Sequence, residues 1–495
     1  MLFNSIDFLL FFPIVTLVYF IIPHKIRYLW LLAASYYFYM CWNPQYALLI
    51  LTSTVITFAS GILISEAGRK GSEKRKKLYV ALSFISNLAI LFLFKYFYFA
   101  VININRVLGA VGLELITPSF SLLLPVGISF YTFQALSYTM DVYRNHVKVE
   151  RNFLKYALFV SFFPQLVAGP IERSSNLISQ IHQRHEFDGK RVARGLQLML
   201  WGYFQKMVIA DRAAYFVNAV YNSPEAATST GLVVVLATVL FAFQIYCDFS
   251  SYSDIARGAA EVMGFELMKN FDTPYFSQSV AEFWRRWHIS LSTWFRDYLY
   301  IPLGGNRKGK LRKYINLMVV FLASGLWHGA SWNFVIWGGL NGAYQVIGDV
   351  TRPLREKLSA KLSGGIENFS SKLLRMLVTF ALICFSWIFF RANGTREAFM
   401  LIRGMFSEFN PWIITDGTLF SLGLDAADMF VLFAALLVLL LVSTAKYKGV
   451  RIRRWLSGQG LWFRYTVYLA GIFCVLIFGI YGATFDAAQF IYFQF

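Results

Sequence analysis

Apolar runs separated by short polar stretches recur along the whole chain. Their lengths are at or near the roughly 20 residues that a transmembrane helix requires. Since helices satisfy their backbone groups internally, the pattern predicts an all-α polytopic membrane protein. The runs lie at residues 8–22, 28–42, 46–65, 78–101, 118–140, 153–170, 196–220, 232–247, 373–390, 429–445 and 465–482. The run at 28–42 is marginal in length, which fits a tilted or shallow helix.

Three of these runs contain residues that are unusual in a regular span. Residues 118–140 include Pro125 and Gly127, and residues 153–170 end in the sequence Phe-Phe-Pro-Gln-Leu-Val-Ala-Gly-Pro. Both runs are interpreted either as broken or re-entrant helices or as kinked spans. The run at 196–220 contains Lys206 and Asp211, which are too far apart for an i,i+4 pair. Each is therefore expected to face other helices or an interface.

Composition and charge agree with a membrane location. Of the 495 residues, 57% are hydrophobic and 15% are charged, where soluble domains have roughly 25% charged residues. The net charge of +19 comes from basic residues in short loops beside the spans, as positive-inside topology produces, so nucleic-acid binding is disfavoured. This rule places Lys25, residues 69–77 and residues 446–454 in the cytoplasm. The N-terminus, residues 407–428 and the C-terminus are then outside. Residues 1–6 lack the basic n-region of a signal peptide.

Several chemical classes lack their usual sequence signals. Cys41, Cys247, Cys384 and Cys474 are scattered without metal-ligand spacing, so no metal site is expected. No glycine-rich phosphate loop follows a predicted strand, which argues against an internal ATPase. Internal repeats typical of many transporters are not evident.

The chemistry of the chain is expected to centre on residues 278–339. Residues 278–303 are too polar to span, and Phe283, Trp287, Trp294 and Tyr298 recur at helical spacing. Arginines, among them Arg285 and Arg286, lie between these aromatic residues, which predicts a helix lying in the membrane interface. His288 in this segment is either hydrogen-bonded within an aromatic patch or a polar group near a cytosolic entrance.

His328 lies within an apolar run that begins at Tyr314, directly after a basic loop. If that run is a regular upright helix, His328 would lie about 21 Å along it. This depth is past the midplane of a hydrocarbon core of about 30 Å. A neutral imidazole there can accept a proton from a hydroxyl group. Gly325 and Gly329 leave room beside it for a substrate or for another backbone. The alternative is a structural histidine bonded to a neighbouring helix.

A third polar group lies at the end of the run at 232–247. It comprises Gln244, Asp248, Tyr252, Ser253 and Asp254. These residues either close a helix terminus or orient one of the histidines through a carboxylate.

The chain resembles the membrane-bound O-acyltransferase family, most closely its alginate O-acetyltransferase branch. The resemblance rests on residues 283–305, which begin Phe-Trp-Arg-Arg-Trp-His-Ile-Ser, and on Leu-Trp-His-Gly at 326–329. Supporting matches lie at residues 130–133, 161–170, 244–254 and 490–495. Ser251 departs from the pattern, because glycine is expected at its position.

The resemblance implies one domain over residues 1–495 with its motif core at 278–339. The family fold would be a horseshoe-like bundle of transmembrane and re-entrant helices around a central tunnel. His328 would be the essential histidine and base, and His288 the family's second histidine. Together with the residue patterns, the resemblance gives a set of expected substrate-binding residues: Arg285, Arg286, Trp287, Trp327, Asn333, Gln244 and Asp248.

The resemblance also implies partners and a location. The donor would be acetyl-CoA or another acyl thioester, such as one on a carrier protein, with no bound cofactor and no metal. A secreted or membrane-tethered esterase-like acetyltransferase would pass the acetyl group to an extracellular polysaccharide such as alginate. The location would be the bacterial inner membrane.

Two other functions are kept as alternatives. One is D-alanyl transfer to teichoic acid, which a related branch of the family performs. The other is a non-enzymatic transporter or flippase, which broken helices would suit.

Overall fold

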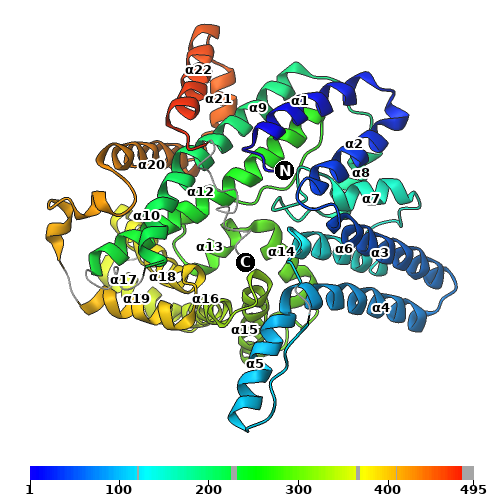
Figure 1. The fold of residues 1–495 in the computed structure, drawn as a ribbon, viewed down its shortest axis with the longest axis horizontal. Helices are drawn as coiled ribbons and strands as arrows, with labels where there is room; N and C mark the ends of the chain where they lie inside the picture. The colour runs from blue at the N-terminus through cyan, green and yellow to red at the C-terminus, as the bar shows by residue number, and fades with distance from the viewer. Residues whose placement is uncertain (120–121, 224–230, 364–367, 408–409, 482–495) are drawn as a thin grey trace. The chain divides into compact units, whose positions relative to one another are not determined.

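The computed structural model describes residues 1–119, 122–223, 231–363, 368–407 and 410–481. Within these ranges every regular element is helical and no strand occurs. The all-α prediction is therefore confirmed (Figure 1). The chain divides into two compact units, one of Met1–Leu198 with Ile255–Met268 and one of Met199–Asp254 with Lys269–Phe495. The single domain and the horseshoe with its tunnel stay predictions.

The first unit contains the N-terminal helices. They are α1 (Ile6–Ile21), α2 (His24–Met40), α3 (Tyr46–Arg69), α4 (Glu73–Leu91), the π-helix η1 (Phe92–Tyr96), α5 (Phe97–Ala110), α6 (Ile128–Tyr143), α7 (Phe153–Ser161) and α8 (Ser174–Ile181). Two helices, α9 (Gly189–Tyr203) and α12 (Gly231–Met263), have residues in both units.

The second unit contains the two histidines of interest. Its first elements are the π-helix η2 (Phe204–Ala210), α10 (Asp211–Tyr221), η3 (Pro274–Phe276), α13 (Val280–Arg286), α14 (Ile289–Phe295), the π-helix η4 (Arg296–Tyr300), α15 (Gly309–His328) and α16 (Trp332–Val350). Its later elements are α17 (Arg352–Ser363), α18 (Phe369–Arg391), α19 (Thr395–Ser407), η5 (Pro411–Ile414), η6 (Thr418–Ser421), α20 (Ala426–Tyr447), α21 (Ile452–Ser457) and α22 (Leu461–Phe478).

Six helical segments in the described part of the chain are long and apolar enough to cross a membrane. They are α3, the continuous α4–η1–α5 helix, α12, α18, α20 and α22. Their number confirms the prediction of a polytopic membrane protein. The first predicted run forms α1, which is shorter, and the marginal run at 28–42 forms α2.

The two proline-containing runs are broken helices in the structure. Helix α6 begins only at Ile128, after Pro125 and Gly127. Helix α7 ends at Ser161, and residues 162–171 continue without helix although all of them are buried. Irregular backbone of this kind is tolerated at membrane depth when protein surrounds it. Of the two interpretations, breaks rather than kinks are therefore observed. The supporting match at 490–495 lies outside the described residues.

One predicted boundary was wrong. The run at 232–247 was expected to end at the polar group that follows it, but α12 continues through that group to Met263. The group therefore does not close a helix terminus. Ser251, at the position where glycine is expected, fits because its hydroxyl donates a 2.7 Å hydrogen bond to the Asp248 carbonyl within the same helix.

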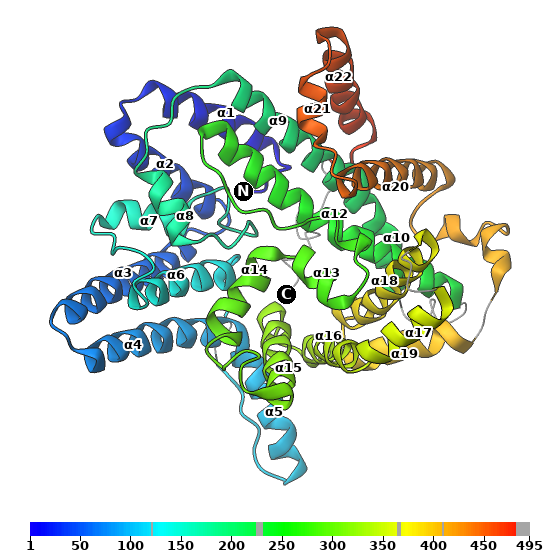
Figure 2. The same ribbon diagram turned by 180° about the vertical axis from the view of Figure 1, so that it is seen from behind.

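Helices from along the second unit supply its apolar core. One cluster of buried side chains includes Val217 of α10, Phe241 of α12, Phe283 of α13, Trp337 of α16 and Trp387 of α18. Helices α15 and α16 lie side by side in Figure 1 and in the reverse view of Figure 2. This core surrounds the residues of the candidate site.

Candidate active site

His328 is the last residue of α15, although the sequence placed it in the middle of one apolar run. The helix stops because Gly329 takes an extended conformation, with φ −161° and ψ 151°. Ser331 then begins α16, its side chain accepting a hydrogen bond from the Asn333 amide. Serine is a preferred residue at this position because its oxygen satisfies an amide that the helix leaves unpaired. The run is thus two helices joined by a sharp turn, with His328 beside the turn.

Helices α15 and α16 approach backbone to backbone near this turn. A Cβ atom added at Gly325 would overlap with the carbonyl oxygen of Phe334, and one added at Gly338 with that of Phe321. Of the two uses foreseen for the space beside Gly325, another backbone occupies it rather than a substrate. The contact fixes the end of α15 that carries His328.

Aromatic rings surround the His328 imidazole, which is 6% exposed. Ring centroids lie 4.9 Å away for Trp327, 5.0 Å for Trp337 and 5.4 Å for Phe390. All three rings meet the imidazole edge to face. Such walls limit the access of bulk water to the ring.

His288 lies between α13 and α14 with a positive φ of 43°, an unusual conformation for a residue other than glycine. Asn270 supports the start of α14. Its backbone oxygen accepts a 2.9 Å hydrogen bond from the Ile289 amide, and its side-chain oxygen accepts one of 3.2 Å from Ser290. The Asn270 amide group in turn donates to Ser253 at 3.0 Å. Asn270 was not foreseen from the sequence, since nothing in its own segment marks it.

Residues 278–303 do not form the single helix that the sequence predicted, and their place at the membrane interface stays a prediction. The segment forms the short elements α13, α14 and η4, and Phe283, Trp287 and Trp294 are buried. The turn at His288 ends the helical spacing on which the prediction relied. Consequently the aromatic residues pack inside the unit instead of forming a continuous stripe.

The two histidines, which are far apart in the sequence, share one enclosure. Their ring centroids are 6.4 Å apart, and Trp327 contacts both rings. His288 also lies 4.6 Å from the ring of Phe249 and is 1% exposed. Burial lowers the pKa of His288 to about 3, so its imidazole is neutral at physiological pH.

Indole groups form a further layer beside the histidines. Trp337 stacks on Trp387 with centroids 5.8 Å apart. Trp284, which also contacts Trp337, donates its indole N–H to Asn341 at 3.1 Å. The indole N–H of Trp337 is buried and has no hydrogen-bond partner among the described residues. Leaving a buried donor unsatisfied costs about 1–3 kcal/mol, so this N–H is suited to a partner that the described residues do not supply. Trp337 was not foreseen from the sequence.

Two of the predicted substrate-binding amides are buried with acceptor capacity remaining. Asn333 donates to the carbonyl oxygen of Ala392 at 2.7 Å, and its Oδ1 accepts no bond within the described part of the chain. The same holds for Oε1 of Gln244. Both are therefore suited to receive a hydrogen bond from a bound molecule. Their roles as binding residues stay predictions.

Asp248 belongs to a buried ionic group. Lys206 contacts Asp248 at 2.5 Å and Asp211 at 2.8 Å, and all three side chains are buried. The expectation that Lys206 faces another helix is confirmed by Asp248 of α12, but the expectation that it does not pair with Asp211 was wrong. Residues 204–210 form a π-helix, whose i,i+5 spacing brings these two side chains together. Gln205, which donates to Ser250 at 2.9 Å, links the same π-helix to α12.

The two arginines predicted to bind substrate differ in their surroundings. Arg285 is exposed. Arg286 pairs with Glu282 at 2.9 Å and donates to Thr273, so it also holds the loop before α13. Trp287 packs against Phe283 and Trp387, each with centroids 5.3 Å away. Donor binding by these residues stays a prediction.

Metal-ligating side chains do not cluster in the described ranges. No three His, Cys, Asp or Glu side chains gather there in a way that would hold a metal ion. The four cysteines are not joined in disulfides. The rings in contact with His328 are imidazole, indole and phenyl.

Similarity to known proteins agrees with this arrangement. Residues 76–390 match the model of the membrane-bound O-acyltransferase family. A probable alginate O-acetylase of Azotobacter vinelandii is 38% identical over 453 residues, covering 91% of this chain and 85% of that protein. A peptidoglycan O-acetyltransferase of Helicobacter pylori is 36% identical over 408 residues, covering 76% of this chain and 73% of that protein.

A more distant relative has a different named activity. A teichoic acid D-alanyltransferase of Streptococcus thermophilus is 29% identical over 293 residues, covering 54% of this chain and 69% of that protein. The family match covers the part of the second unit that precedes residue 391, at the end of α18. This part includes both histidines and the helices that carry them. The chain therefore belongs to the membrane-bound O-acyltransferase family and is a multi-pass membrane acyltransferase.

Proposed function

We propose that this chain takes an acetyl group from a cytosolic thioester and moves it across the membrane for O-acetylation of an extracellular polysaccharide such as alginate. The observation that carries the proposal is the enclosure in which His288 and His328 lie with ring centroids 6.4 Å apart. The named activities of the Azotobacter vinelandii and Helicobacter pylori relatives support acetyl as the transferred group.

His328 acts as the general base in this proposal. Its imidazole accepts the proton of the attacking hydroxyl while the hydroxyl oxygen bonds to the thioester carbonyl carbon. The carbon–sulfur bond then breaks, and the thiolate leaves and takes up a proton. Water would hydrolyse the thioester, so the aromatic walls around His328 favour transfer over hydrolysis.

Trp337 supplies a hydrogen bond to the reacting carbonyl. During attack, negative charge develops on the carbonyl oxygen, and a positioned N–H donor stabilises it. The indole N–H of Trp337 is buried, has no partner among the described residues and belongs to a ring in contact with His328. Its unused donor capacity suits this role.

Donor and partner follow from the same proposal. The donor is acetyl-CoA or a carrier-protein thioester, and no cofactor remains bound. Exposed Arg285 and the neighbouring Arg286 attract the phosphates of such a donor. A secreted or membrane-tethered esterase-like acetyltransferase receives the acetyl group outside. The chain resides in the bacterial inner membrane with its N-terminus on the extracytoplasmic side.

D-alanyl transfer to teichoic acid is the second candidate function. It is favoured by the Streptococcus thermophilus relative, whose match is lower in identity and shorter than those of the acetyl-transferring relatives. The transporter alternative is dropped because the chain belongs to an acyltransferase family.

A donor-exchange assay tests the proposal. Membranes containing the full chain are supplied with acetyl-CoA, an acetylated carrier protein or a D-alanylated carrier protein, and release of the free thiol is measured with an acceptor polysaccharide and partner present. Turnover with an acetyl donor is expected, and His328→Ala should remove it. Turnover with the D-alanyl donor alone would assign the second function instead.

A further inference from the structure

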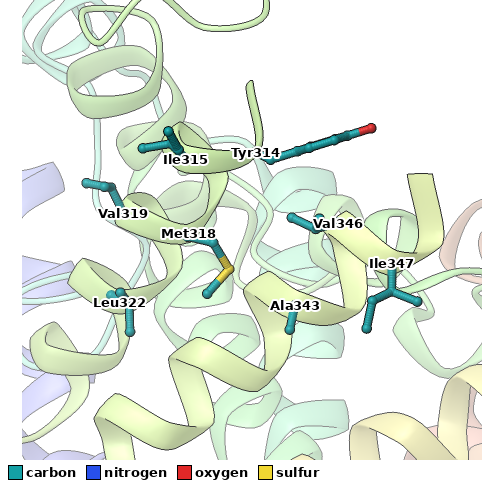
Figure 3. A pocket seen from close by; sticks show the side chains of 8 residues that line it. All are labelled: Tyr314, Ile315, Met318, Val319, Leu322, Ala343, Val346 and Ile347. Carbon is teal, nitrogen blue, oxygen red and sulfur yellow. The ribbon is translucent and has the colours of Figure 1, made fainter. Parts of the chain in front are cut away.

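An apolar groove lies between α15 and α16 on the surface of the second unit (Figure 3). Its volume is about 380 Å³, within the range of small-molecule sites, and its accessible lining is entirely apolar. Side chains from both helices line it, including Ile315, Met318, Leu322, Ala343, Val346 and Ile347. Figure 3 shows these side chains on the two neighbouring helices, with Met318 and Ala343 between them.

The groove is bounded at both ends. Toward His328 the helices close where Gly325 and Gly338 meet the facing backbone. At the opposite end, Lys313 of α15 pairs with Asp349 of α16 at 2.7 Å, and the Tyr314 hydroxyl donates to the same carboxylate at 3.0 Å. The groove is therefore an opening held between the glycine contact at one end and the Lys313–Asp349 ion pair at the other.

The open side of the groove is suited to lipid. Ile315 is 46% exposed, Val319 40% and Ile347 58%. In water such a patch of branched apolar side chains is unfavourable, whereas in a bilayer it meets hydrocarbon. An acyl chain matches both its shape and its lack of polar groups.

Cationic side chains lie beyond the polar end of the groove, where Lys313 pairs with Asp349. Lys310 and Arg312 lie in the first turn of α15, within roughly 8 Å of Ile315 along the helix axis, and both are exposed. Arg355, just after α16, is exposed and donates to the Gly348 carbonyl of that helix. Asp349 is committed to Lys313, whose hydrogen bond holds the pKa of that carboxyl below its ordinary value. The remaining local charge is therefore positive.

We propose that this groove binds an anionic phospholipid. One acyl chain lies between α15 and α16, and the phosphate and its anionic headgroup bind Lys310, Arg312 and Arg355. The charge at the polar end selects the headgroup, and the apolar lining selects a chain-bearing molecule over a free phosphate. This site does not depend on which acyl group or acceptor the enzyme uses.

Photo-crosslinking tests the position of the lipid in the unmodified protein. The full chain is purified, placed in phosphatidylcholine bilayers and given a trace of phosphatidylglycerol carrying a diazirine in one acyl chain. Labelled peptides from residues 314–322 and 343–347 are expected. Labelling spread evenly over the exposed faces of α20 and α22 would overturn the proposal.

Two variants and a matched control test the two parts of the site. Ala343→Phe fills the groove, and the double variant Lys310→Gln, Arg312→Gln removes headgroup charge. Leu441→Phe, on an exposed apolar face of α20, adds comparable bulk elsewhere. Retention of phosphatidylglycerol, followed by native mass spectrometry, should fall at least tenfold in the first two variants and not in the control.

Further outcomes would reject the proposal. Equal retention of phosphatidylcholine and phosphatidylglycerol by the wild type would exclude charge selection. Displacement of the lipid by inorganic phosphate alone would exclude the acyl-chain contact. A Tm for each variant shows whether it is folded. If Ala343→Phe does not fold, Ala343→Leu takes its place, and unchanged retention in a folded variant rejects the groove.

Discussion

The position of His328 is set by its neighbours in the backbone rather than by its own side chain. It ends α15 because Gly329 is extended and Ser331 starts the next helix. The glycine contact between α15 and α16 holds that end in place. A substitution confined to the imidazole therefore leaves the supporting structure unchanged.

Replacement of His328 by alanine should remove activity without unfolding the protein. General-base catalysis typically contributes about 10²–10⁴-fold, so surface acetylation should fall at least roughly 100-fold. Acetyl content of the polysaccharide and Tm are measured together on protein expressed at wild-type level. Normal acetylation in a well-expressed variant would disprove the assignment of the base.

Trp337 and Trp284 provide a matched pair of indole variants. Trp337→Phe should lower kcat by about 10²–10³-fold with little change in KM, as expected for a donor that acts on developing charge. Its Tm should fall less than that of Trp284→Phe, because both variants leave a similar cavity but Trp337 loses no hydrogen bond to a described residue. Trp284→Phe should lower Tm and spare kcat, since Asn341 loses its 3.1 Å donor. The reverse pattern would make the Trp337 N–H a structural group.

His288→Ala should weaken use of the donor more than use of the acceptor. The imidazole is buried against Phe249 and close to His328, and it follows directly on the segment with Arg285 and Arg286. The KM of the donor is expected to rise while dependence on the acceptor stays nearly constant. Titrations with each substrate at two salt concentrations measure this. Wild-type kinetics in the folded fraction, together with a Tm several degrees lower, would identify His288 as a packing residue.

At the scale of helices, the apolar runs predicted where the spans lie. They did not predict where a helix breaks or changes its spacing. The runs that became α3, α18 and α20 are recognisable because apolar length alone identifies them. The turn at His288 depends on Asn270, whose hydrogen bonds form only in the folded chain. The π-helix at 204–210 likewise changes the spacing on which an i,i+4 argument relies.

The candidate site was predictable in its reactive residues and not in their arrangement. His288 and His328 are marked in the sequence by their motifs. That they lie 6.4 Å apart results from tertiary packing, in which Trp284 of α13 contacts Trp337 of α16, and no local pattern encodes this packing. Trp337 could not be recognised from the sequence, because the sequence contains many aromatic residues. It stands out only in the structure, where its indole N–H has no partner among the described residues.

The ionic group between η2, α10 and α12 gives a prediction at this scale. Lys206→Met leaves Asp211 and Asp248 buried without their cation, and breaking a buried pair costs about 3–5 kcal/mol. A large fall in Tm is expected, and Asp211→Asn with Asp248→Asn in the same chain should restore much of it. Thermal unfolding of the purified variants measures both effects. If the fall in Tm of the triple variant equals the sum of the falls in the single variants, the three residues do not act as one group.

For the whole molecule, the distribution of charge predicts which loops face the cytoplasm. Basic residues cluster around Arg69, Lys308 and Arg453, and residues 407–428 contain no lysine or arginine. Positive-inside topology therefore places the first three loops inside and Asp416 outside.

Labelling with a membrane-impermeant thiol reagent checks this topology. Cysteine is introduced at each of the four sites in a variant without Cys41, Cys247, Cys384 and Cys474. In intact cells, only Asp416→Cys should react, whereas all four should react after permeabilisation. Reaction of Arg69→Cys in intact cells would contradict the topology and the depth predicted for His328.

The π-helix at 204–210 also affects how the chain tolerates a change in length. In an α-helix, residues five apart lie about 140° apart around the axis, and residues four apart lie about 40° apart. Loss of one residue between Lys206 and Asp211 would therefore turn this segment into an α-helix and keep the two side chains on one face. The helices that follow would keep their orientation. A single-residue deletion here should consequently be accepted, whereas the same deletion within α15 would rotate His328 away from its partners.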